Sequence, residues 1–393
     1  MRDVVIVAGC RTPIGTIGGQ FKTLAPVELT IPVMQNLIKR SGIDPVIIDD
    51  VIWGCNYQRT YKENNLARVA AVKAGLPVTV PGITIHRNCT SSMSAIQMGF
   101  YQIRAGEAEC IMAGGSDSMS TAPHMVFNAR YGQKYGHMEM RDSMWDSLTN
   151  LGVGPAMGIT AENVADKYGI TREQMDAYSL RSQQRAVAAI DAGRFEEEII
   201  PVTVKTRKSE TTYTVDEYPK RNATLEGLQK LKPAFKEGGK VTAGNASGMN
   251  DASSGVILMS EEKAKELGCP IIAKVVSVAT TGVEPELMGI GPISSTKKAL
   301  EKAGLTVDDI DLFEINEAFS SQCLACQQEL GVPDDKLNVN GGGISLGHPV
   351  GATGSRIVIT LMYELKRRKQ RYGVATLCAG GGMGTTVIIE MMQ

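Results

Sequence analysis

Cys89 stands at a place where a cysteine can do chemistry, after a predicted strand and at the start of a predicted helix, in HRNCTSSMSAI. The field of a helix N-terminus and its free backbone N–H groups favour the thiolate, which is the nucleophilic form of cysteine. A thiol with a pKa near 8.5 is roughly 3% thiolate at pH 7, whereas a pKa lowered to about 7 makes it about half thiolate. The alternative is packing, since buried cysteines are common core residues.

His348 occupies a matching position later in the chain. ITIHRNCTSSMSAIQMGF (83–100) parallels LNVNGGGISLGHPVGATGSRI (337–357), and each reads as a short strand, a tight turn and a helix. In a duplicated fold with pseudo-twofold symmetry these two turns would meet at the junction of the halves. A cysteine beside a histidine is the minimal activated nucleophile.

Two further groups follow predicted strands. Cys378 precedes the glycines 380–382, whose bare backbone N–H groups suit an anion pocket or form an ordinary tight turn. Asn316 follows a buried strand, where an amide can serve chemistry or cap a helix. Two cysteines, a histidine and an asparagine thus fall at strand ends, which favours nucleophilic catalysis beside a pocket for negative charge.

The elements that position these residues form a repeat. Besides the strand–turn–helix pair, two more segments match in the same order about 260 residues apart, 27–56 with 292–316 and 110–119 with 376–385. The first pair reads as amphipathic helix, glycine, acidic turn and buried strand, and the second as a strand that runs into a glycine turn. Such a repeat predicts a duplicated α/β unit, a sheet core with helices outside.

The repeat also predicts how the chain is divided. The first half comprises residues 1–119 together with 251–270, because SSGVILMS (253–260) is strand-like and rejoins it. The second half comprises 271–393, and 120–250 is an insertion between the halves. Within the insertion, residues 203–240 hold nine Lys and Arg against five Asp and Glu. A charge run is usually a solvated face, and this one is also suited to a polyanionic ligand.

Composition excludes several classes of protein. The 393 residues are 43% hydrophobic and 21% charged, with a net charge of −1, so a general electrostatic grip on nucleic acid or an anionic membrane is not expected. Apolar runs fall short of a membrane span, and the apolar part of the N-terminus is too short for a signal peptide. A cytoplasmic protein without a membrane segment is expected.

The cysteines and histidines indicate neither a disulfide framework nor a metal. The eight cysteines are scattered along a long chain, and the four histidines are dispersed. Cys323 and Cys326 form one CxxC within a helix-like stretch, with no second pair to complete a metal site, so packing is expected for both.

Five segments of the sequence resemble the thiolase family, the acetyl-CoA acetyltransferases and 3-ketoacyl-CoA thiolases, and the likeness extends over essentially the whole chain. They are TAENVADKYGITREQMDAYSLRSQ (160–183), VTAGNASGMNDASS (241–254), INEAFSSQ (315–322), NVNGGGISLGHPVGATGSRI (338–357) and CAGGGMGTTVIIE (378–390). The resemblance implies an α/β, thiolase-like duplicated αβαβα layered fold with an inserted loop domain. It implies reversible CoA-dependent cleavage of 3-ketoacyl-CoA, or condensation of acetyl-CoA with acyl-CoA, through an acyl-cysteine.

The resemblance also implies a role for each candidate residue. Cys89 would carry the acyl group, His348 would activate it, and Cys378 would be the acid/base at the substrate α-carbon. Asn316, through a water, would form one oxyanion pocket with His348. The backbone N–H groups of Cys89 and Gly380 would form the other.

For substrate binding the family assigns CoA to the loop domain. By resemblance Ser247 contacts the pantetheine arm, Phe235, Met157 and Phe319 form its apolar lining, and Lys220 and Arg221 lie at the nucleotide end. CoA and acyl-CoA would be substrates, with no permanently bound cofactor or metal. The family likeness further implies a homotetramer.

The sequence departs from the usual family pattern at four places. His86 replaces an asparagine, Thr90-Ser91-Ser92 replaces Gly-Ser-Gly, and Gly227 replaces a serine. Ala156 stands where members specialised for acetoacetyl-CoA usually have a histidine. All the catalytic positions are kept, so these departures bear on the substrate. The smaller Ala156 is expected to open the acyl pocket to longer or branched chains.

Two other functions fit parts of the pattern. A condensing enzyme of the ketosynthase or 3-hydroxy-3-methylglutaryl-CoA synthase type shares the fold but lacks the second catalytic cysteine, so Cys378 argues against it. A silent scaffold that binds CoA or a partner enzyme tends to lose the nucleophile or the GHP histidine. Both Cys89 and His348 are present here.

Overall fold

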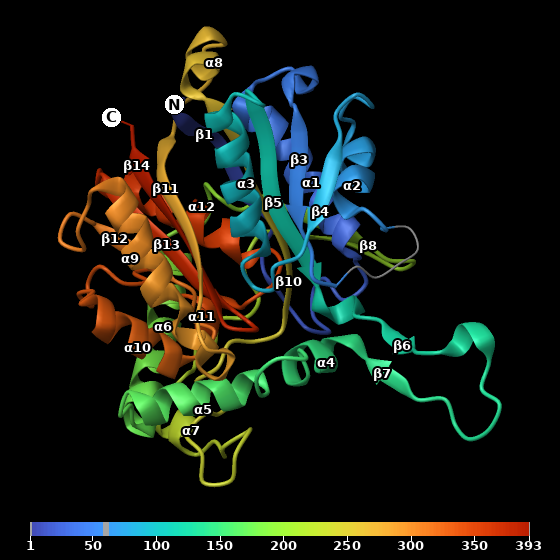
Figure 1. The fold of residues 1–393 in the computed structure, drawn as a ribbon, viewed down its shortest axis with the longest axis vertical. Coiled ribbons are helices and arrows are strands. Elements are labelled where there is room, and N and C mark those ends of the chain that lie inside the picture. Colours follow the sequence, from blue (N-terminus) through green and yellow to red (C-terminus); the bar gives the residue numbers. More distant parts are fainter. Residues whose placement is uncertain (1, 58–62, 393) are drawn as a thin grey trace.

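One mixed sheet of ten strands forms the centre of the protein, and the computed structural model describes residues 2–57 and 63–392 (Figure 1). In chain order its strands are β1 Val4–Arg11, β2 Gly15–Thr16, β3 Asp50–Gly54, β4 Gly82–Ile85, β5 Cys110–Ser118, β10 Asn250–Ser260, β11 Ala273–Gly282, β12 Leu312–Ile315, β13 Tyr372–Ala379 and β14 Met383–Met391. Across the sheet the order is β12-β13-β14-β11-β1-β10-β5-β3-β4, and β2 pairs with β10.

This strand order is symmetric about the β1–β11 junction. Strands β1, β10, β5 and β3 on one side correspond to β11, β14, β13 and β12 on the other. The pairs β3–β5 and β12–β13 are parallel, whereas β5–β10 and β13–β14 are antiparallel. The duplicated α/β fold expected from the internal repeats is therefore confirmed.

The two sides of the sheet are joined by a short contact. β1 pairs with β11 only through Val5 opposite Lys274 and Ile6 opposite Ala273. By contrast, β1 pairs with β10 from one end of β1 to the other, from Val4 opposite Ser260 to Arg11 opposite Ser254. β10 thus belongs with the first-half strands although the insertion precedes it in the chain.

Helices cover both outer faces of the sheet and also fill its middle. In the two halves they are α1 Pro26–Ser41, α2 Leu66–Ala74, α3 Ser91–Ala105, α8 Glu261–Glu266, α9 Gly291–Ala303, α10 Ser320–Leu330, α11 Gly343–Leu346 and α12 Thr353–Arg368, with 3-10 turns η1 Pro45–Ile47 and η4 Pro285–Ile290. α1 and α2 pack on the outer face of the first-half strands, and α9 and α10 on that of the second-half strands. α3 and α12 lie between the two sets of strands (Figure 1).

The expectation that helices lie only outside the sheet is therefore wrong for α3 and α12. Every residue of α12 from Thr353 to Leu365 is buried, so this helix has no solvated face over those turns. A helix that is buried all round belongs inside a protein rather than on its surface. The resulting five layers give the predicted αβαβα order.

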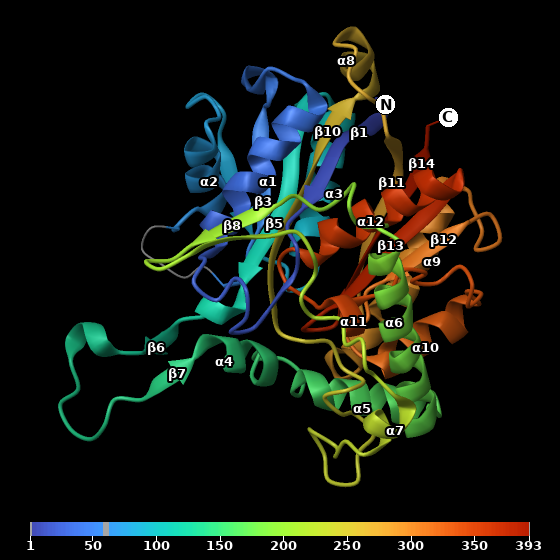
Figure 2. The same cartoon turned by 180° about the vertical axis from the view of Figure 1, so that it is seen from behind.

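The insertion has its own short elements. They are η2 Met119–Thr121, β6 His124–Val126, η3 Ala129–Tyr131, β7 Met140–Asp142, α4 Ser143–Thr149, α5 Met157–Lys167, α6 Arg172–Asp191, β8 Val202–Lys205, β9 Glu210–Tyr213 and α7 Leu225–Gln229. The β6–β7 hairpin projects away from the body as an arm (Figure 1), whereas β8 crosses behind the first half, where its Val202 and Val204 pack with Leu29 of α1 (Figure 2). Buried Arg11 binds Glu198 and Asp216, which anchors the insertion to β1.

One glycine pair does not form the expected turn. Gly114 and Gly115 lie inside β5, because a side chain on Gly114 would meet the Trp53 ring at 2.5 Å and one on Gly115 would meet the Gly351 carbonyl oxygen at 2.0 Å. These glycines admit close neighbours to a strand. The glycine turn is found only in the second-half copy of this segment.

The CxxC cysteines are packing residues, as expected. Cys323 and Cys326 lie in α10, fully buried in an apolar cluster with Phe313 and Ile315.

Over the described ranges of the chain, no helix combines the length and apolar character that a membrane span requires.

Candidate active site

The turn that carries Cys89 is built from hydrogen bonds of its own residues. Asn88, just before the cysteine, has a left-handed backbone with φ 47°, a conformation that asparagine tolerates better than most residues. Thr90 Oγ1 donates to the Arg87 carbonyl at 2.8 Å, and Ser91 Oγ donates to the Asn88 carbonyl at 2.7 Å. The hydroxyls of Thr90 and Ser91 thus stabilise the turn that carries Cys89. The sequence comparison with Gly-Ser-Gly did not predict this role.

The histidine turn packs directly against this segment. The Ser355 N–H donates to Ser92 Oγ at 2.9 Å, and a side chain on Gly354 would meet the Met93 backbone nitrogen at 2.5 Å. Val350 lines the same cavity as Cys89. The structure therefore brings the two repeated turns together, as the sequence symmetry predicts.

Asp117 ties the two turns to a third segment. Its carboxylate accepts the Gly351 N–H at 2.6 Å and the N–H groups of Asn56 and Tyr57, each at 3.0 Å. Asn56 Nδ2 in turn donates to the Asn88 carbonyl at 3.2 Å. Sequence reasoning missed Asp117, and the only signal was a carboxylate at the end of a glycine-containing strand.

His348 is held at two points and leaves one ring nitrogen open. Its backbone N–H donates to Asn250 Oδ1 at 3.0 Å, and its Nδ1 lies 2.6 Å from Thr353 Oγ1. Its Nε2 is buried and has no hydrogen-bond partner among the described residues. Burial, assisted by the charge of Arg356, lowers the pKa of His348 to about 3, so the ring is neutral at pH 7.

The pKa of the Cys89 thiol differs from the one expected from the sequence. Burial raises the pKa of its thiol to about 11, although the backbone N–H groups of Gly380 and Cys89 act in the opposite direction. The expected lowering toward 7 is therefore wrong, because desolvation of the thiolate outweighs those N–H groups and Asp117 adds a like charge. A thiol that stays protonated needs a base before it can attack, and neutral His348 is the base at hand.

The glycine turn 380–382 is both the tight turn and the donor site that the sequence left open. It connects β13 to β14, and Gly381 and Gly382 have φ of 86° and 84°. A side chain on Gly380 would meet Leu151 Cδ1 at 2.6 Å, and both residues line the cavity. Asn88 Nδ2 donates to the Gly380 carbonyl at 2.7 Å, which fixes this turn beside Cys89.

Cys378 and Asn316 complete the set. Cys378 is fully buried at the end of β13, where burial and the nearby Cys89 raise the pKa of its thiol well above the usual range. Asn316 follows β12, and neither its Nδ2 nor its Oδ1 has a partner in the described part of the chain. It does not cap α10, since Gln322 Oε1 accepts the Ala318 N–H at that helix start.

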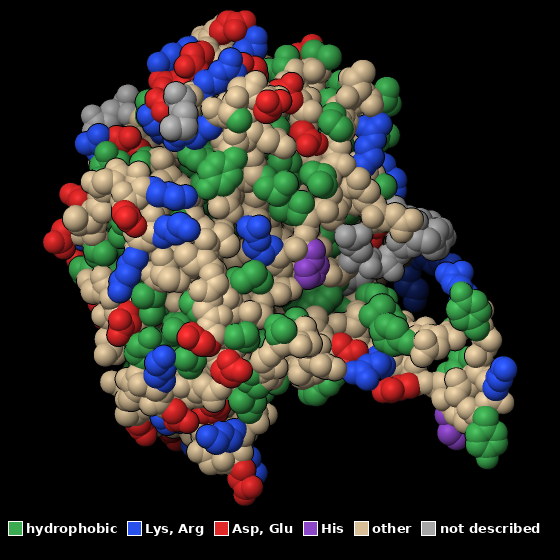
Figure 3. All heavy atoms as spheres, in the orientation of Figure 1, with side chains coloured by type: hydrophobic (Ala, Val, Ile, Leu, Met, Phe, Trp, Pro, Cys, Tyr) green, Lys and Arg blue, Asp and Glu red, His purple; other side chains and the backbone are tan. Residues whose placement is uncertain are grey.

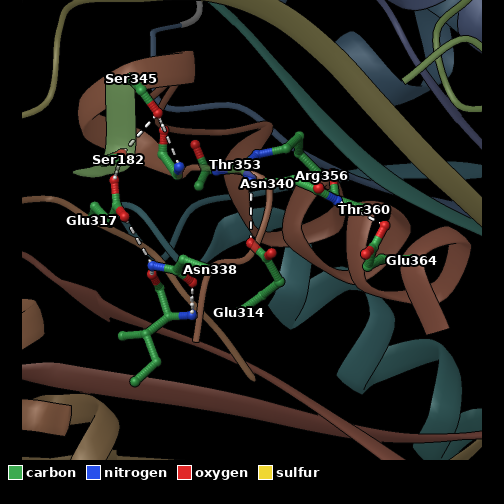
Figure 4. Close-up of polar contacts among 12 residues, drawn as sticks. Ser182, Glu314, Glu317, Asn338, Asn340, Ser345, Thr353, Arg356, Thr360 and Glu364 are labelled. Atoms are coloured by element: carbon green, nitrogen blue, oxygen red, sulfur yellow. Dashed lines mark hydrogen bonds and ion pairs between the residues drawn. The ribbon is translucent and has the colours of Figure 1, made fainter. Parts of the chain in front are cut away.

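A buried network positions the segment of Asn316 (Figure 4). The neighbouring Glu317 carboxylate accepts from Tyr178 Oη at 3.0 Å, from Ser182 Oγ at 2.6 Å and from Asn338 Nδ2 at 3.1 Å. Tyr178 and Ser182 belong to α6 of the insertion. The insertion therefore helps to fix the backbone that presents the Asn316 amide.

A cavity of about 250 Å³ lies at Cys89. It is lined by Asn56, Tyr57, His86, Asn88, Cys89, Pro123, Met125, Ser143, Ser147, Leu148, Leu151, Met157, Val350 and Gly380. The insertion supplies most of its apolar residues, and one of them, Met157, also packs against the apolar cluster that contains Cys378. Ala156 immediately precedes α5, and its neighbour Met157 is the residue at the cavity.

The three apolar residues expected to line the pantetheine arm lie near one another in the structure. The rings of Phe235 and Phe319 pack edge to face with centroids 6.4 Å apart, and Phe319 lies in one cluster with Met157. Ser247 donates its N–H to the Ala318 carbonyl at 2.9 Å.

Lys220 and Arg221 lie elsewhere, on a surface pocket beside α6. Arg221 makes a two-pronged ion pair with Asp191, at 2.8 and 3.1 Å. The Lys220 Nζ lies 5.7 Å from the centroid of the Tyr218 ring and has no ion-pair partner among the described residues. Of the two expected phosphate contacts, Lys220 is the one with an uncommitted charge.

Comparison with known proteins agrees with this geometry. The chain matches the thiolase N-terminal domain over residues 4–262 and the thiolase C-terminal domain over 269–391. It is 50% identical to the acetyl-CoA acetyltransferase of Syntrophomonas wolfei, with 100% of each chain covered. It is 47% identical to that of Pseudomonas aeruginosa, with 99% of each covered.

Solved structures give the same result. The acetyl-CoA acetyltransferase of Bacillus anthracis has a TM-score of 0.97 and 47% identity, with 100% of this chain and 99% of that chain covered. Human mitochondrial 3-ketoacyl-CoA thiolase in complex with CoA has a TM-score of 0.96 and 43% identity, with 100% and 98% covered. The chain therefore belongs to the thiolase family of acyltransferases.

Proposed function

We propose that the chain cleaves 3-ketoacyl-CoA with CoA, and in reverse condenses acetyl-CoA with acyl-CoA, through an acyl-Cys89 intermediate. One observation carries the proposal: three buried polar atoms without partners among the described residues, His348 Nε2 and both side-chain atoms of Asn316, occur in the segments that meet at Cys89 and Cys378. Burying such atoms unpaired costs about 1–3 kcal/mol each, so a protein keeps them where a reacting molecule satisfies them.

In the first half-reaction the Cys89 thiol gives its proton to His348 Nε2, and the sulfur forms a bond to the thioester carbonyl carbon. The backbone N–H groups of Cys89 and Gly380 receive the negative charge on the carbonyl oxygen, and each such donor contributes about 3–4 kcal/mol. The C–S bond to CoA then breaks, and the departing sulfur takes the proton back from Nε2. The product is a thioester, which passes its acyl group on without a large loss of free energy.

In the second half-reaction Cys378 acts at the α-carbon. For condensation it first passes its own thiol proton to His348 Nε2, and the resulting thiolate removes a proton from the α-carbon of acetyl-CoA. The carbanion forms a C–C bond to the acyl-Cys89 carbonyl carbon, the C–S bond to Cys89 breaks, and the Cys89 sulfur takes the proton from Nε2. For cleavage it returns that proton to the departing acetyl-CoA. Asn316, through a water, and His348 hold the enolate oxygen. The proximity of the two thiols supports this role, since the charge of Cys89 acts on Cys378.

CoA and acyl-CoA are the proposed substrates, without a resident cofactor. Ser247, Met157, Phe235 and Phe319 hold the pantetheine arm, and Lys220 with Arg221 holds the nucleotide end. The CoA complex of the human relative supports this proposal. The proposed acyl group is acetyl, giving acetoacetyl-CoA, or a somewhat longer chain in fatty acid metabolism.

The proposed domain division follows from these roles. Residues 1–119 with 251–270 carry the nucleophile, 271–393 carry Asn316, His348 and Cys378, and 120–250 bind CoA and make oligomer contacts.

A homotetramer is the proposed assembly, and the arm between β6 and β7 supports it. Large apolar side chains are exposed on this arm and on the adjoining helix α4 (Figure 3). Those more than one third exposed include Trp145 in α4 and, on the arm, Met125, Val126, Phe127, Tyr131, Tyr135, Met138 and Met140. So much exposed apolar surface marks an interaction site. Light scattering should give four times the 42.1 kDa chain mass, and a monomer would contradict the assembly.

We place the protein in the cytoplasm, without nucleic-acid partners. The eight cysteines lie among the described residues and form no disulfide, which suits a reducing compartment. The net charge of −1 supports the second point.

The decisive experiment is incubation with acetyl-CoA followed by intact-mass measurement and peptide mapping. The proposal expects one acetyl group on Cys89 and none in Cys89→Ala. A silent scaffold would bind CoA without acquiring the acetyl group. Turnover of 3-ketoacyl-CoA substrates of increasing length then defines the acyl preference.

A further inference from the structure

The hydroxyl of Thr353 lies between His348 and a backbone carbonyl. Thr353 Oγ1 is 2.6 Å from His348 Nδ1 and 2.8 Å from the carbonyl oxygen of Pro349. Thr353 is fully buried and His348 is 6% exposed, so water does not compete for these bonds. The geometry of a single hydroxyl therefore determines what Nδ1 can do.

A hydroxyl has one proton, and a carbonyl oxygen can only accept. If the Thr353 proton pointed at Nδ1, two oxygen atoms with facing lone pairs would lie 2.8 Å apart at Pro349. With the proton on the Pro349 carbonyl, Oγ1 accepts from Nδ1–H. The second arrangement places the ring proton on Nδ1 and leaves a lone pair on Nε2.

We propose that Thr353 is a positioning residue that holds His348 in the Nδ1–H tautomer, so that Nε2 is free to accept the Cys89 proton. The inference rests on the proposed role of His348 as the base. With the other tautomer, Nε2 would present a proton to the Cys89 thiol and no base would face it. In the reverse transfer Nε2 gives its proton to the departing CoA sulfur, and Nδ1–H stays bonded to Thr353 throughout.

The support of Thr353 is rigid, which such a role requires. Thr353 is the first residue of α12, and the next two positions pack on α3: Gly354 abuts the Met93 backbone, and the Ser355 N–H bonds Ser92 Oγ. On the other side, the His348 backbone N–H donates to Asn250 Oδ1, which fixes the backbone of the histidine. The hydroxyl, the ring and the helix that follows Cys89 thus form one packed unit.

Thr353→Val tests the proposal, because valine keeps the shape and removes the hydroxyl. The burst of Cys89 acetylation by acetyl-CoA, followed by rapid quench and peptide mass, should slow about 10- to 100-fold, as for a weakened general base. The KM for acetyl-CoA should change less than about twofold. Thr353→Ser should restore at least half of the parent rate.

Thr360→Val is the matched control. Thr360 is another buried threonine of α12, and its hydroxyl donates to Glu198 Oε1 at 3.1 Å, away from the histidine. The control should acetylate Cys89 within about twofold of the parent rate. Acetylation at the parent rate in Thr353→Val, or an equal slowing in Thr353→Ser, would overturn the proposal.

A measurement on the unaltered protein does not depend on how the variants fold. The chain has four histidines, so ¹⁵N-histidine spectra compared with those of His348→Gln identify the signals of His348. Protonated Nδ1 and unprotonated Nε2 at pH 7 are expected, and a protonated Nε2 would refute the assignment. If His348→Gln itself acetylated Cys89 at the parent rate, the proposed base would be wrong, which is a separate outcome from failure of the Thr353 proposal.

Discussion

Asn88 Nδ2 donates a 2.7 Å hydrogen bond to the carbonyl oxygen of Gly380. This bond joins the turn of the nucleophile in the first half to the glycine turn of the second half. Because the carbonyl of Gly380 is held in this way, the position of the whole residue is restricted, and with it the N–H that acts on the Cys89 thiol. The two proposed oxyanion donors, one from each half, therefore depend on one amide side chain.

Asn88→Gly should isolate that contribution. Glycine tolerates the φ of 47°, so the change removes the amide without adding backbone strain. Since loss of one oxyanion donor costs about 10²- to 10³-fold, loss of its support should slow Cys89 acetylation about tenfold. Asn128→Gly is the control, because Asn128 also has a positive φ (61°) but is exposed on the arm. Equal rates for the two variants would contradict the role of Asn88.

The ionisation of Cys89 predicts slow alkylation of the resting enzyme. Its folded pKa is about 11, above the usual value, so the thiolate fraction rises about tenfold per pH unit up to about pH 11. The rate of iodoacetamide labelling, read from the Cys89 peptide, should therefore climb steadily between pH 7 and 10. A plateau reached by pH 8 would show that the thiolate is stabilised more than burial allows.

A substitution of Cys378 should distinguish the roles proposed for the two thiols. Cys378→Ser is nearly isosteric, but a hydroxyl is a far weaker acid than a thiol and a poor proton carrier near neutral pH. Cys89 should still be acetylated in a burst, whereas condensation and the exchange of acetyl-CoA α-hydrogens with deuterated water should be lost. His348→Ala should instead slow the acetylation. Hydrogen exchange at the parent rate in Cys378→Ser would return the acid/base role to His348.

The basic pair at the insertion should not act as two equal contacts. Lys220→Ala should raise the KM for CoA several-fold with little change in turnover, and the effect should shrink at high salt. Arg221→Ala should change KM less, because Asp191 already neutralises this guanidinium. Asp191→Asn releases Arg221 and should lower the KM for CoA. An unchanged KM in all three variants would make this stretch a solvated face only.

The sequence predicts the site better than its chemistry. Cys89, His348, Asn316 and Cys378 could be proposed because each lies in one of the repeated segments of the sequence. Asp117 could not, because its partners are backbone N–H groups far away in the chain, including that of Gly351. Such contacts leave no spacing pattern to detect.

Burial explains the remaining differences. The thiol of Cys89 was expected to be acidic from the helix start alone, but desolvation depends on what the opposite half places over it. The amphipathic pattern of α12 likewise suggests one covered face, whereas the fold covers all of them with strands from both halves. Periodicity reports which residues are apolar, and not how many layers surround them.

The narrow seam between β1 and β11 has a consequence for assembly of the chain. Only Val5 and Ile6 of β1 pair with β11, so strand pairing contributes little to holding the halves together. The halves are held mainly by the apolar packing of α3 and α12 between their strands. That layer is an apolar surface of the kind found between permanently associated subunits. The two halves thus resemble the subunits of a heterodimer that are joined in one polypeptide. The proposed reaction centre forms only where these halves pack against each other.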